Sequence, residues 1–551
     1  MSISTIEECD YVVVGAGFYG LAVAKQLHCT QPDRTLLIFE GQSALGGKWA
    51  KDRLFPGLKS NNLLGTYEYP DFPMTADRFD VKPGEHIPGE VINTYIKAYA
   101  EEFGIIDFVK LETTEDISQQ GLPKELGYVE SKDRYCLWAG KSGWDAVYQY
   151  AIAGVKVNWV IRSSGHGPIW MAPPYVTPFK KWIEKLANTR FLTWFSPCIW
   201  GDADGYWGIR YFYHRTAIGR FIVDRFWNIL SQDVITINKF DSHPDTAKLK
   251  PWVHVMFTGC SYSILNYEHD FFELVKSDKI NIHIGEIIRL SPGKVHLADG
   301  TEFESEAFLA NTGWTHVPPI KFLPEGIEKE LGIPHEVAEN APVQDLANNH
   351  ALLGRADKEI LERFPRLKIQ PVWNKNFGSL INQKGISADE RSRIPLTPYM
   401  LHRFLVPASP RFLRPRDIAF IGHQTNFSNI ITAHITGLWV SAYFSGKLTR
   451  DPSKAVDDKE EMEKLQYETV LHNRFGKWRY PTEWGNKGPN FTFDAVPYFD
   501  LLQRDLGLNP FRKSNTLTEM YDPYGPEDYR YINEEWLEKQ AQASGADKSV
   551  D

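Results

Sequence analysis

A glycine-rich turn between a strand and a helix constrains the fold of this chain more than any other feature. Residues 11–14 form a β-branched apolar run, and a helix is expected over about residues 18–27. In such a turn one glycine permits the tight bend, one lets backbone approach a pyrophosphate, and one lets helix and strand pack closely. The turn reads Gly15-Ala16-Gly17-Phe18-Tyr19-Gly20. We expect the strand to be a central one, covered on both faces.

A carboxylate ends this first unit. A second strand is expected over residues 35–39, and Glu40 follows it, where the two hydroxyls of a ribose would lie. A carboxylate at this place disfavours a 2'-phosphate, so the unit is predicted to bind FAD or NAD rather than NADP. The alternative is a glycine-rich turn in some other α/β sheet.

A second glycine pair follows shortly afterwards. Gly46 and Gly47 precede Lys48 and Trp49. Backbone without side chains can lie against a planar or phosphorylated ligand here. The alternative interpretation is an ordinary loop.

Length and charge limit the remaining possibilities. A chain of 551 residues is expected to form two or more domains. Its net charge of -9, without blocks of like charge, argues against nucleic-acid binding. Five scattered cysteines suggest neither disulfides nor zinc and fit a reducing compartment, the cytoplasm. No catalytic triad or metal cluster is apparent, and the apolar segment 430–444 is too short to span a bilayer, so a buried helix is expected.

A second strand-turn-helix-strand unit is expected further along the chain. Its helix lies near residues 145–153 and its following strand at 155–161, ending at Arg162. Residues 170–235 are rich in tryptophan and are expected to cover a pocket. Further strands are expected at residues 280–284, 295–297, 308–310 and 418–421.

Taken in order, these motifs resemble the flavin-containing monooxygenase family, especially its fungal dimethylaniline-monooxygenase-like branch. The match covers roughly residues 10–450. It is carried by VVVGAGFYG with Glu40, GGKW, KSNN followed by YPDFP, GKSGWD, VIR, NTGW and IGHQTNFSN.

The resemblance implies two nucleotide cofactors. FAD would be bound by the first turn, Glu40, the segment from Gly47 to Trp49 and Gly422, which ends the 418–421 strand. NADPH would be bound by the turn that includes Lys141 and Ser142. Trp138 replaces the tight-turn glycine there, so the pyrophosphate would be held less closely. Arg162 could pair with the 2'-phosphate, which favours NADPH over NADH; the alternative is a surface arginine without a ligand.

One asparagine is the catalytic candidate. Asn61 lies ten residues before the Asp71-Phe72-Pro73 motif, where the family places an asparagine beside the flavin ring. An amide there can hydrogen-bond the reactive edge of the flavin in a dry pocket. Asn62 is the neighbouring candidate, and a turn-forming pair without a chemical part is the other interpretation.

One expected strand is absent from the sequence. The family runs a further FAD-domain strand, ending in Ala-Thr-Gly, before the NADPH domain, but residues 105–135 are too short and too polar to hold it. Either the sheet closes with fewer strands, or the chain is a shortened version of an active relative.

The predicted fold is therefore α/β, with two Rossmann-like dinucleotide-binding domains, the NADPH domain inserted in an incomplete FAD domain, and a helical aromatic-rich insertion. The expected boundaries are 1–130 and 314–450 for the FAD domain, 131–313 for the NADPH domain with its insertion at 170–260, and 451–551 for a C-terminal extension. The predicted function is an FAD-dependent monooxygenase that uses NADPH and molecular oxygen on a small organic molecule such as a secondary metabolite. The alternative is a non-catalytic or uncoupled flavin-binding protein.

Overall fold

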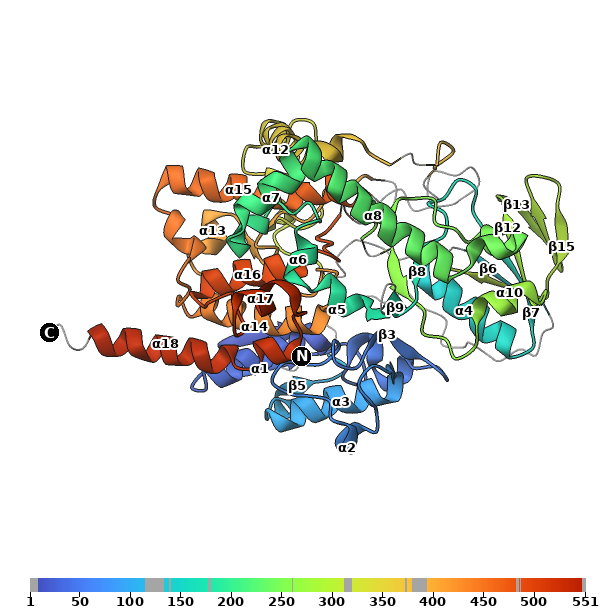
Figure 1. Cartoon of the computed structure of the whole chain (residues 1–551). Helices are drawn as coiled ribbons and strands as arrows, with labels where there is room; N and C mark the ends of the chain where they lie inside the picture. Colours follow the sequence, from blue (N-terminus) through green and yellow to red (C-terminus); the bar gives the residue numbers. More distant parts are fainter. Residues whose placement is uncertain are drawn as a thin grey trace.

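The computed structural model has the predicted α/β fold, with two separate parallel sheets that each carry a Rossmann-like unit (Figure 1). The structure describes residues 8–113, 133–137, 140–176, 180–259, 261–311, 320–371, 374–378, 394–481, 485 and 487–547. Trp138 and the Thr312-Gly313-Trp314 part of the NTGW turn lie outside the described residues. So does most of the segment 105–135, whose sequence was judged too short and too polar for the additional strand.

The first βαβ unit forms where it was predicted. Strand β1 (Tyr11–Val14) runs parallel to β2 (Leu36–Phe39), and helix α1 (Phe18–Thr30) connects them. Gly15 has a φ of +99°, which a residue with a side chain rarely adopts. A Cβ on Gly20 would overlap the carbonyl oxygen of Gly15, so the third glycine is what allows α1 to begin this close to the strand.

Helix α1 packs against α14 (Asn429–Phe444), the buried helix expected at 430–444. Residues 430–443 are all buried, as expected for a helix that is apolar on every side. The backbones approach closely at Gly437, where a Cβ would lie 3.1 Å from the carbonyl oxygen of Ala22. This pair of helices joins the beginning of the chain to a segment four hundred residues later.

The sheet that contains β1 is small. A two-residue strand, β5 (Val109–Lys110), pairs with β2, and the order is β1-β2-β5. Among the described residues β1 is therefore an edge strand, and Val12 and Val14 are 52% and 65% exposed. The prediction of a central strand covered on both faces is wrong. The described residues place no strand on the other edge of β1, and Val12 and Val14 on one of its faces are exposed.

The strand predicted at 418–421 does not form either. The backbone N–H of Phe420 donates to the carbonyl of Leu405 (2.7 Å), so the segment bonds to a neighbouring loop and not to a sheet edge. A strand needs a partner edge, and this segment has none among the described residues.

The second sheet is larger and wholly parallel. It consists of β6 (Asp133–Leu137), β7 (Lys156–Ile161), β12 (Ile280–Ile284) and β16 (Ala307–Ala310), in the order β12-β7-β6-β16. Helix α4 (Lys141–Ile152) crosses from β6 to β7 and buries Trp144 against Trp159. The strands predicted at 155–161, 280–284 and 308–310 are confirmed to within one residue.

A smaller antiparallel sheet adjoins the second parallel sheet. It is formed by β13 (Ile287–Ser291), β14 (Lys294–Leu297) and β15 (Glu302–Glu304), and it includes the strand predicted at 295–297. Val295 and Leu297 pack against Val160 of β7.

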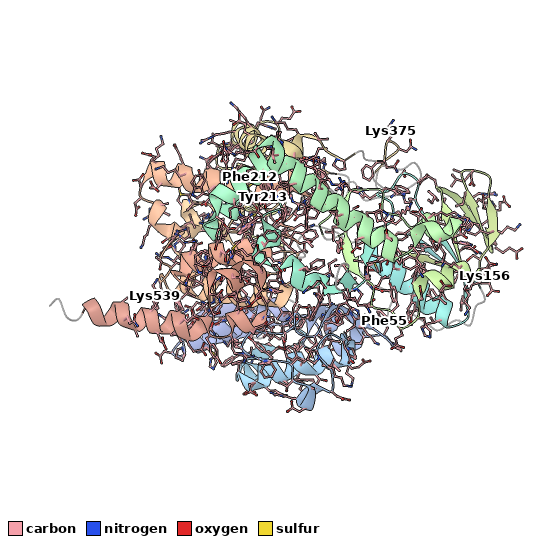
Figure 2. The ribbon with its side chains drawn as sticks, viewed as in Figure 1. Phe55, Lys156, Phe212, Tyr213, Lys375 and Lys539 are labelled. Atoms are coloured by element: carbon pink, nitrogen blue, oxygen red, sulfur yellow. The ribbon has the colours of Figure 1, made fainter. Side chains whose placement is uncertain are left out.

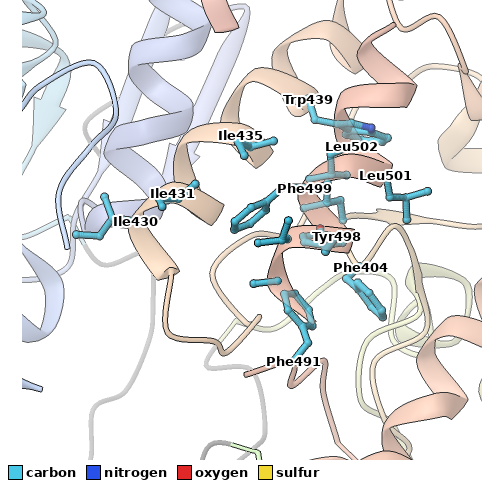
Figure 3. Close-up of a cluster of buried hydrophobic side chains, with 14 of the residues drawn as sticks. Phe404, Ile430, Ile431, Ile435, Trp439, Phe491, Tyr498, Phe499, Leu501 and Leu502 are labelled. Atoms are coloured by element: carbon cyan, nitrogen blue, oxygen red, sulfur yellow. The ribbon is translucent and has the colours of Figure 1, made fainter. Parts of the chain in front are cut away.

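The aromatic region and the C-terminal helices share one core with α1 and α14. Helices α15 (Lys459–Arg479) and α16 (Ala495–Leu506) pack beside the aromatic segment 190–257. Figure 3 shows Ile435 and Trp439 of α14 facing Phe499 and Leu502 of α16. None of the helices in the described residues is both long and apolar enough to cross a membrane.

Candidate functional site

The first glycine turn presents bare backbone at the start of α1. Gly17 is the N-cap of α1 and no side chain caps the helix there. A Cβ on Gly17 would meet only the Cα of Gly47, at 3.8 Å. Amides at a helix start, with the positive end of the helix dipole behind them, are suited to a phosphate.

The second glycine pair lies against the first turn. The N–H of Gly46 donates to the carbonyl of Ala16 (3.0 Å), and Gly46 and Gly47 both have positive φ. Lys48 is exposed, and Trp49 donates its indole N–H to the hydroxyl of Tyr67 (3.2 Å). The structure therefore brings together two motifs that the sequence shows only as neighbours.

Glu40 lies next to the same turn. Its buried carboxylate accepts hydrogen bonds from the N–H of Ala16 (2.8 Å) and of Gln42 (3.0 Å). A carboxylate has about four acceptor positions, so these two bonds leave capacity for a ligand hydroxyl. Glu40 thus both shapes the turn and borders the place where a ribose would lie.

Gly422 returns to this turn from far along the chain. It has a φ of +81°, and a Cβ there would lie 3.3 Å from Cγ of Tyr19. Phe18, beside Tyr19, accepts a hydrogen bond at its carbonyl from the Tyr69 hydroxyl (2.6 Å). The predicted FAD residues from the two ends of the chain therefore converge, although the strand expected before Gly422 is absent.

The two candidate asparagines lie on strand β3 (Lys59–Leu63) and differ sharply. Asn61 is exposed. The side-chain amide of Asn62 donates to the carboxylate of Glu184 and to the carbonyl of Phe427 (2.9 Å). Both remain candidates, and the geometry attaches only Asn62 to a buried network.

Glu184, on α5 (Ile183–Ala187), is a functional candidate that the sequence analysis missed. It is fully buried, and its carboxyl also bonds the N–H of Leu63 (3.1 Å) and the indole N–H of Trp182 (2.8 Å). Burial raises the pKa of Glu184 to about 7, against the effect of these donors. Its only sequence signal was an acidic residue within an aromatic segment.

Because the pKa of Glu184 is raised on folding, the folded chain keeps a proton that the unfolded chain releases between about pH 4.5 and pH 7. The free energy of unfolding should therefore fall by up to about 3 kcal/mol as the pH rises through this window. Glu184→Gln should remove this fall. Urea unfolding of both proteins at several pH values measures it.

The control is Trp182→Phe, which removes a donor that favours the ionised carboxylate. The midpoint of the fall should then move to higher pH. Identical pH profiles for wild type and Glu184→Gln would contradict the assignment.

The second unit has a similar helix start at α4. Gly140 is its N-cap, without a side-chain cap, and Ser142 is exposed in the first turn. The ammonium group of Lys141 bonds Asp145 and the side-chain oxygen of Asn266 (2.8 Å), and burial lowers the pKa of this lysine. Lys141 is therefore already partnered, and Ser142 is the more accessible of the two predicted residues.

Asn266 connects this helix to strand β3. Its amide donates to the carbonyls of Lys59 (3.1 Å) and Ser60 (3.3 Å) on β3. The strand that carries Asn61 and Asn62 is thus tied directly to the start of the second unit.

Arg162 directly follows β7, with 12% of its side chain exposed. Its guanidinium donates to the hydroxyl of Ser164 (2.8 Å) and the carbonyl of Gly378 (2.7 Å). The carboxylate of Glu286 lies 3.7 Å from its Nε. Arg162 is therefore a mostly buried cation beside a carboxylate, and its pairing with a 2'-phosphate stays a prediction.

Comparisons with known proteins agree with the motifs. Residues 13–70 match the model of an NAD(P)-binding Rossmann-like domain. The chain is 28% identical to the FAD-dependent monooxygenase rstn6 of Aspergillus nomiae, over 96% of this chain and 98% of that protein. It is 21% identical to the probable flavin-containing monooxygenase 1 of Arabidopsis thaliana, over 95% and 96%. Among solved structures, the S-allyl-L-cysteine S-oxygenase of Allium sativum matches at 13% identity over 90% of this chain and 88% of that chain, with a TM-score of 0.40.

The sequence alignment also shows a difference in length. The alignment with the Aspergillus protein extends over 598 positions, whereas 96% of this 551-residue chain is only about 529. The relative therefore has about 70 residues without a counterpart here. The resemblance predicted from the motifs is confirmed. The expectation for the segment 105–135 stays a prediction, because the alignment length does not place the missing residues.

Proposed function

We propose that this relative of the flavin monooxygenases is itself an FAD-dependent monooxygenase that uses NADPH and molecular oxygen to oxygenate a small organic molecule, such as a secondary metabolite. The observation that carries the proposal is the convergence of the bare turn at Gly17, the carboxylate of Glu40 and the positive-φ Gly422. The names of the full-length relatives support it.

The residues of the first unit fit FAD. The amides at the start of α1 would hold the pyrophosphate, and Glu40 would accept from the ribose hydroxyls. Gly47 leaves room because it has no side chain on the face toward Gly17. FAD bound there would supply the redox chemistry that activates oxygen, with electrons from NADPH.

The residues of the second unit fit a dinucleotide with a 2'-phosphate. Ser142 and the first amides of α4 would contact the pyrophosphate, and Arg162 would pair with the 2'-phosphate. Glu286 lies beside that arginine and would repel a phosphate, so it would weaken the binding that Arg162 provides.

The buried network orients the flavin side of the site. Glu184 and the carbonyl of Phe427 together hold the amide of Asn62 in one position. These two hydrogen bonds also fix the position of β3, on which Asn61 would face the flavin. The side chains of Glu184, Asn62 and Asn61 would keep water out of the site and would orient hydrogen bonds toward the flavin. They would not take part in the reaction themselves.

The second candidate function is that of an uncoupled or non-catalytic flavin-binding protein. The observation that favours it is the edge position of β1, whose exposed Val12 and Val14 leave the first unit less enclosed. In a less enclosed site that admits water, the two electrons from NADPH would leave with molecular oxygen as hydrogen peroxide, and no substrate would be oxygenated.

The purified chain should carry bound flavin, visible in its absorption spectrum, and should consume oxygen with NADPH faster than with NADH. Arg162→Ala should weaken the binding of NADPH about tenfold to a hundredfold, because it removes a charge-assisted pair with the 2'-phosphate. The binding of NADH should be nearly unchanged. Flavin reduction followed in a stopped-flow instrument measures both.

Glu286→Gln is the matched control. It removes the repelling carboxylate beside Arg162, so NADPH should bind more tightly than to wild type. A colourless protein that takes up no FAD would exclude the enzyme, and equal losses for NADPH and NADH would exclude the assigned role of Arg162.

A further inference from the structure

Two consecutive helices carry an unusual exposed apolar surface. Helix α7 (Trp207–Arg215) leads into α8 (Ala217–Ile237), which runs along the outside of the molecule (Figure 1). Figure 2 shows Phe212 of α7 at the upper end of this pair. We call the outer side of these helices the α7–α8 face; its large apolar residues, between 36% and 69% exposed, include Trp207, Tyr211, Ile218, Phe221, Ile222 and Ile229.

The α7–α8 face is separate from the side of α8 that packs into the core. Helix α8 already buries its opposite side through Gly219, Val223, Trp227 and Val234. The exposed apolar residues of α8 lie at positions 218, 221, 222 and 229, so they share one side of the helix. Exposed Arg225 lies between Ile222 and Ile229 on that side. A helix with two apolar sides needs a second apolar environment for the outer one.

The turn between the helices holds this face rigid. Thr216 caps α8 by accepting from the N–H of Gly219 (3.0 Å). A Cβ on Gly219 would lie 2.6 Å from the Cα of Tyr213, so the two helices are in backbone contact. The aromatic residues of α7 and the stripe of α8 therefore stay in one surface.

The exposed charges of the two helices are more often positive than negative, and their acidic residues are Asp224 and Asp233, both partly exposed. Arg215 and Arg225 are exposed and Arg220 is partly exposed. Asp224 is neutralised by Arg366 (2.5 Å). Arg215 also lies over the ring of Tyr211 (5.3 Å). On a chain of net charge -9, this local excess of arginine is complementary to an anionic partner.

We propose that the α7–α8 face binds the surface of an anionic phospholipid bilayer. Apolar side chains would enter the boundary of headgroups and acyl chains, tryptophan and tyrosine would lie at that boundary, and the arginines would contact lipid phosphates. The 21 residues of α8 extend for about 30 Å, enough for a helix that lies in the plane of the membrane. The proposal goes beyond the monooxygenase function and does not depend on it.

Vesicle co-sedimentation of the full chain tests the proposal without any activity measurement. Wild type should sediment with phosphatidylcholine vesicles that contain phosphatidylserine, and less with pure phosphatidylcholine or at high salt. The triple variant Ile218→Gln, Phe221→Gln, Ile229→Gln should bind at least tenfold more weakly. Arg215→Glu with Arg225→Glu should lower binding more than tenfold, because each arginine near an anionic surface strengthens binding roughly fivefold.

The matched control replaces three apolar residues that are at least as exposed elsewhere. Leu323→Gln, Val343→Gln and Leu517→Gln together should leave vesicle binding unchanged. Equal thermal unfolding of all variants verifies that each is folded.

Three outcomes would overturn the proposal. The first is that wild type binds neither kind of vesicle. The second is that the triple variant and its control bind vesicles equally. The third is that the triple variant turns a dimer into a monomer while wild type does not bind lipid, which would make the α7–α8 face a contact between copies of this chain.

Discussion

Gly20→Ala should destabilise the chain by at least about 3 kcal/mol and abolish flavin binding with it. The new methyl group would overlap the carbonyl oxygen of Gly15 and lie 3.0 Å from its carbonyl carbon. Both are backbone atoms, so no side chain can rotate away. Helix α1 cannot retreat, because it is packed against α14 at Gly437. Urea unfolding measures the loss, and the absorption spectrum of the purified protein measures flavin content.

Gly17→Ala is the informative comparison, at the second glycine of the same motif, three positions before Gly20. Its methyl group would meet only the Cα of Gly47 at 3.8 Å, an ordinary contact. The folded chain should therefore tolerate it, with a stability change below about 1 kcal/mol, yet lose flavin because the methyl group occupies the surface expected to face the pyrophosphate. Normal flavin content in Gly17→Ala would show that the pyrophosphate lies elsewhere.

Arg190→Met should cost about 3–5 kcal/mol of stability. Arg190 is fully buried on α6 (Arg190–Thr193) and bonds Asp500 of α16 (2.6 Å), Glu519 of α17 (Thr516–Tyr521) (2.8 Å) and the hydroxyl of Tyr524 (2.8 Å). Without the guanidinium two carboxylates remain buried together. Burial raises the pKa of Asp500 to about 6 even with Arg190 present.

The predicted loss should be localised as well as large. The cluster joins the aromatic segment to the C-terminal helices, so limited proteolysis should cut the Arg190→Met chain after α16 before it cuts elsewhere. Thermal unfolding gives the size of the effect.

The control for Arg190 is an exposed pair of similar geometry, Arg414 with Asp457 (2.8 Å). Arg414→Met should change stability by less than about 1 kcal/mol, because water screens that pair. If both variants lost the same stability, burial would not be the cause of the Arg190 effect.

Much of the fold could be predicted because its signals are local. Both βαβ units, helix α14 and the strands β12, β14 and β16 follow from short apolar runs with glycine at their ends. The position of Glu40 beside the turn follows from strand length, since a parallel neighbour ends at the same edge. The family resemblance rests on these same motifs.

The candidate site was predicted only in part. The glycines and Glu40 converge as expected, and Gly422 joins them without its strand. Glu184 was not found, because its role depends on burial against β3 from a segment more than a hundred residues away. The distinction between Asn61 and Asn62 likewise depends on which way β3 faces.

The order of the amino acids alone therefore dictated the local units: where glycine permits a tight turn, where a helix begins, and which carboxylate follows a strand. Tertiary packing decided which strands found partners, which side of β1 stayed exposed, and which acid was buried deeply enough to hold a proton near neutral pH. The reason is physical. Backbone preferences act within a few residues, whereas desolvation and strand pairing depend on neighbours that are distant along the chain.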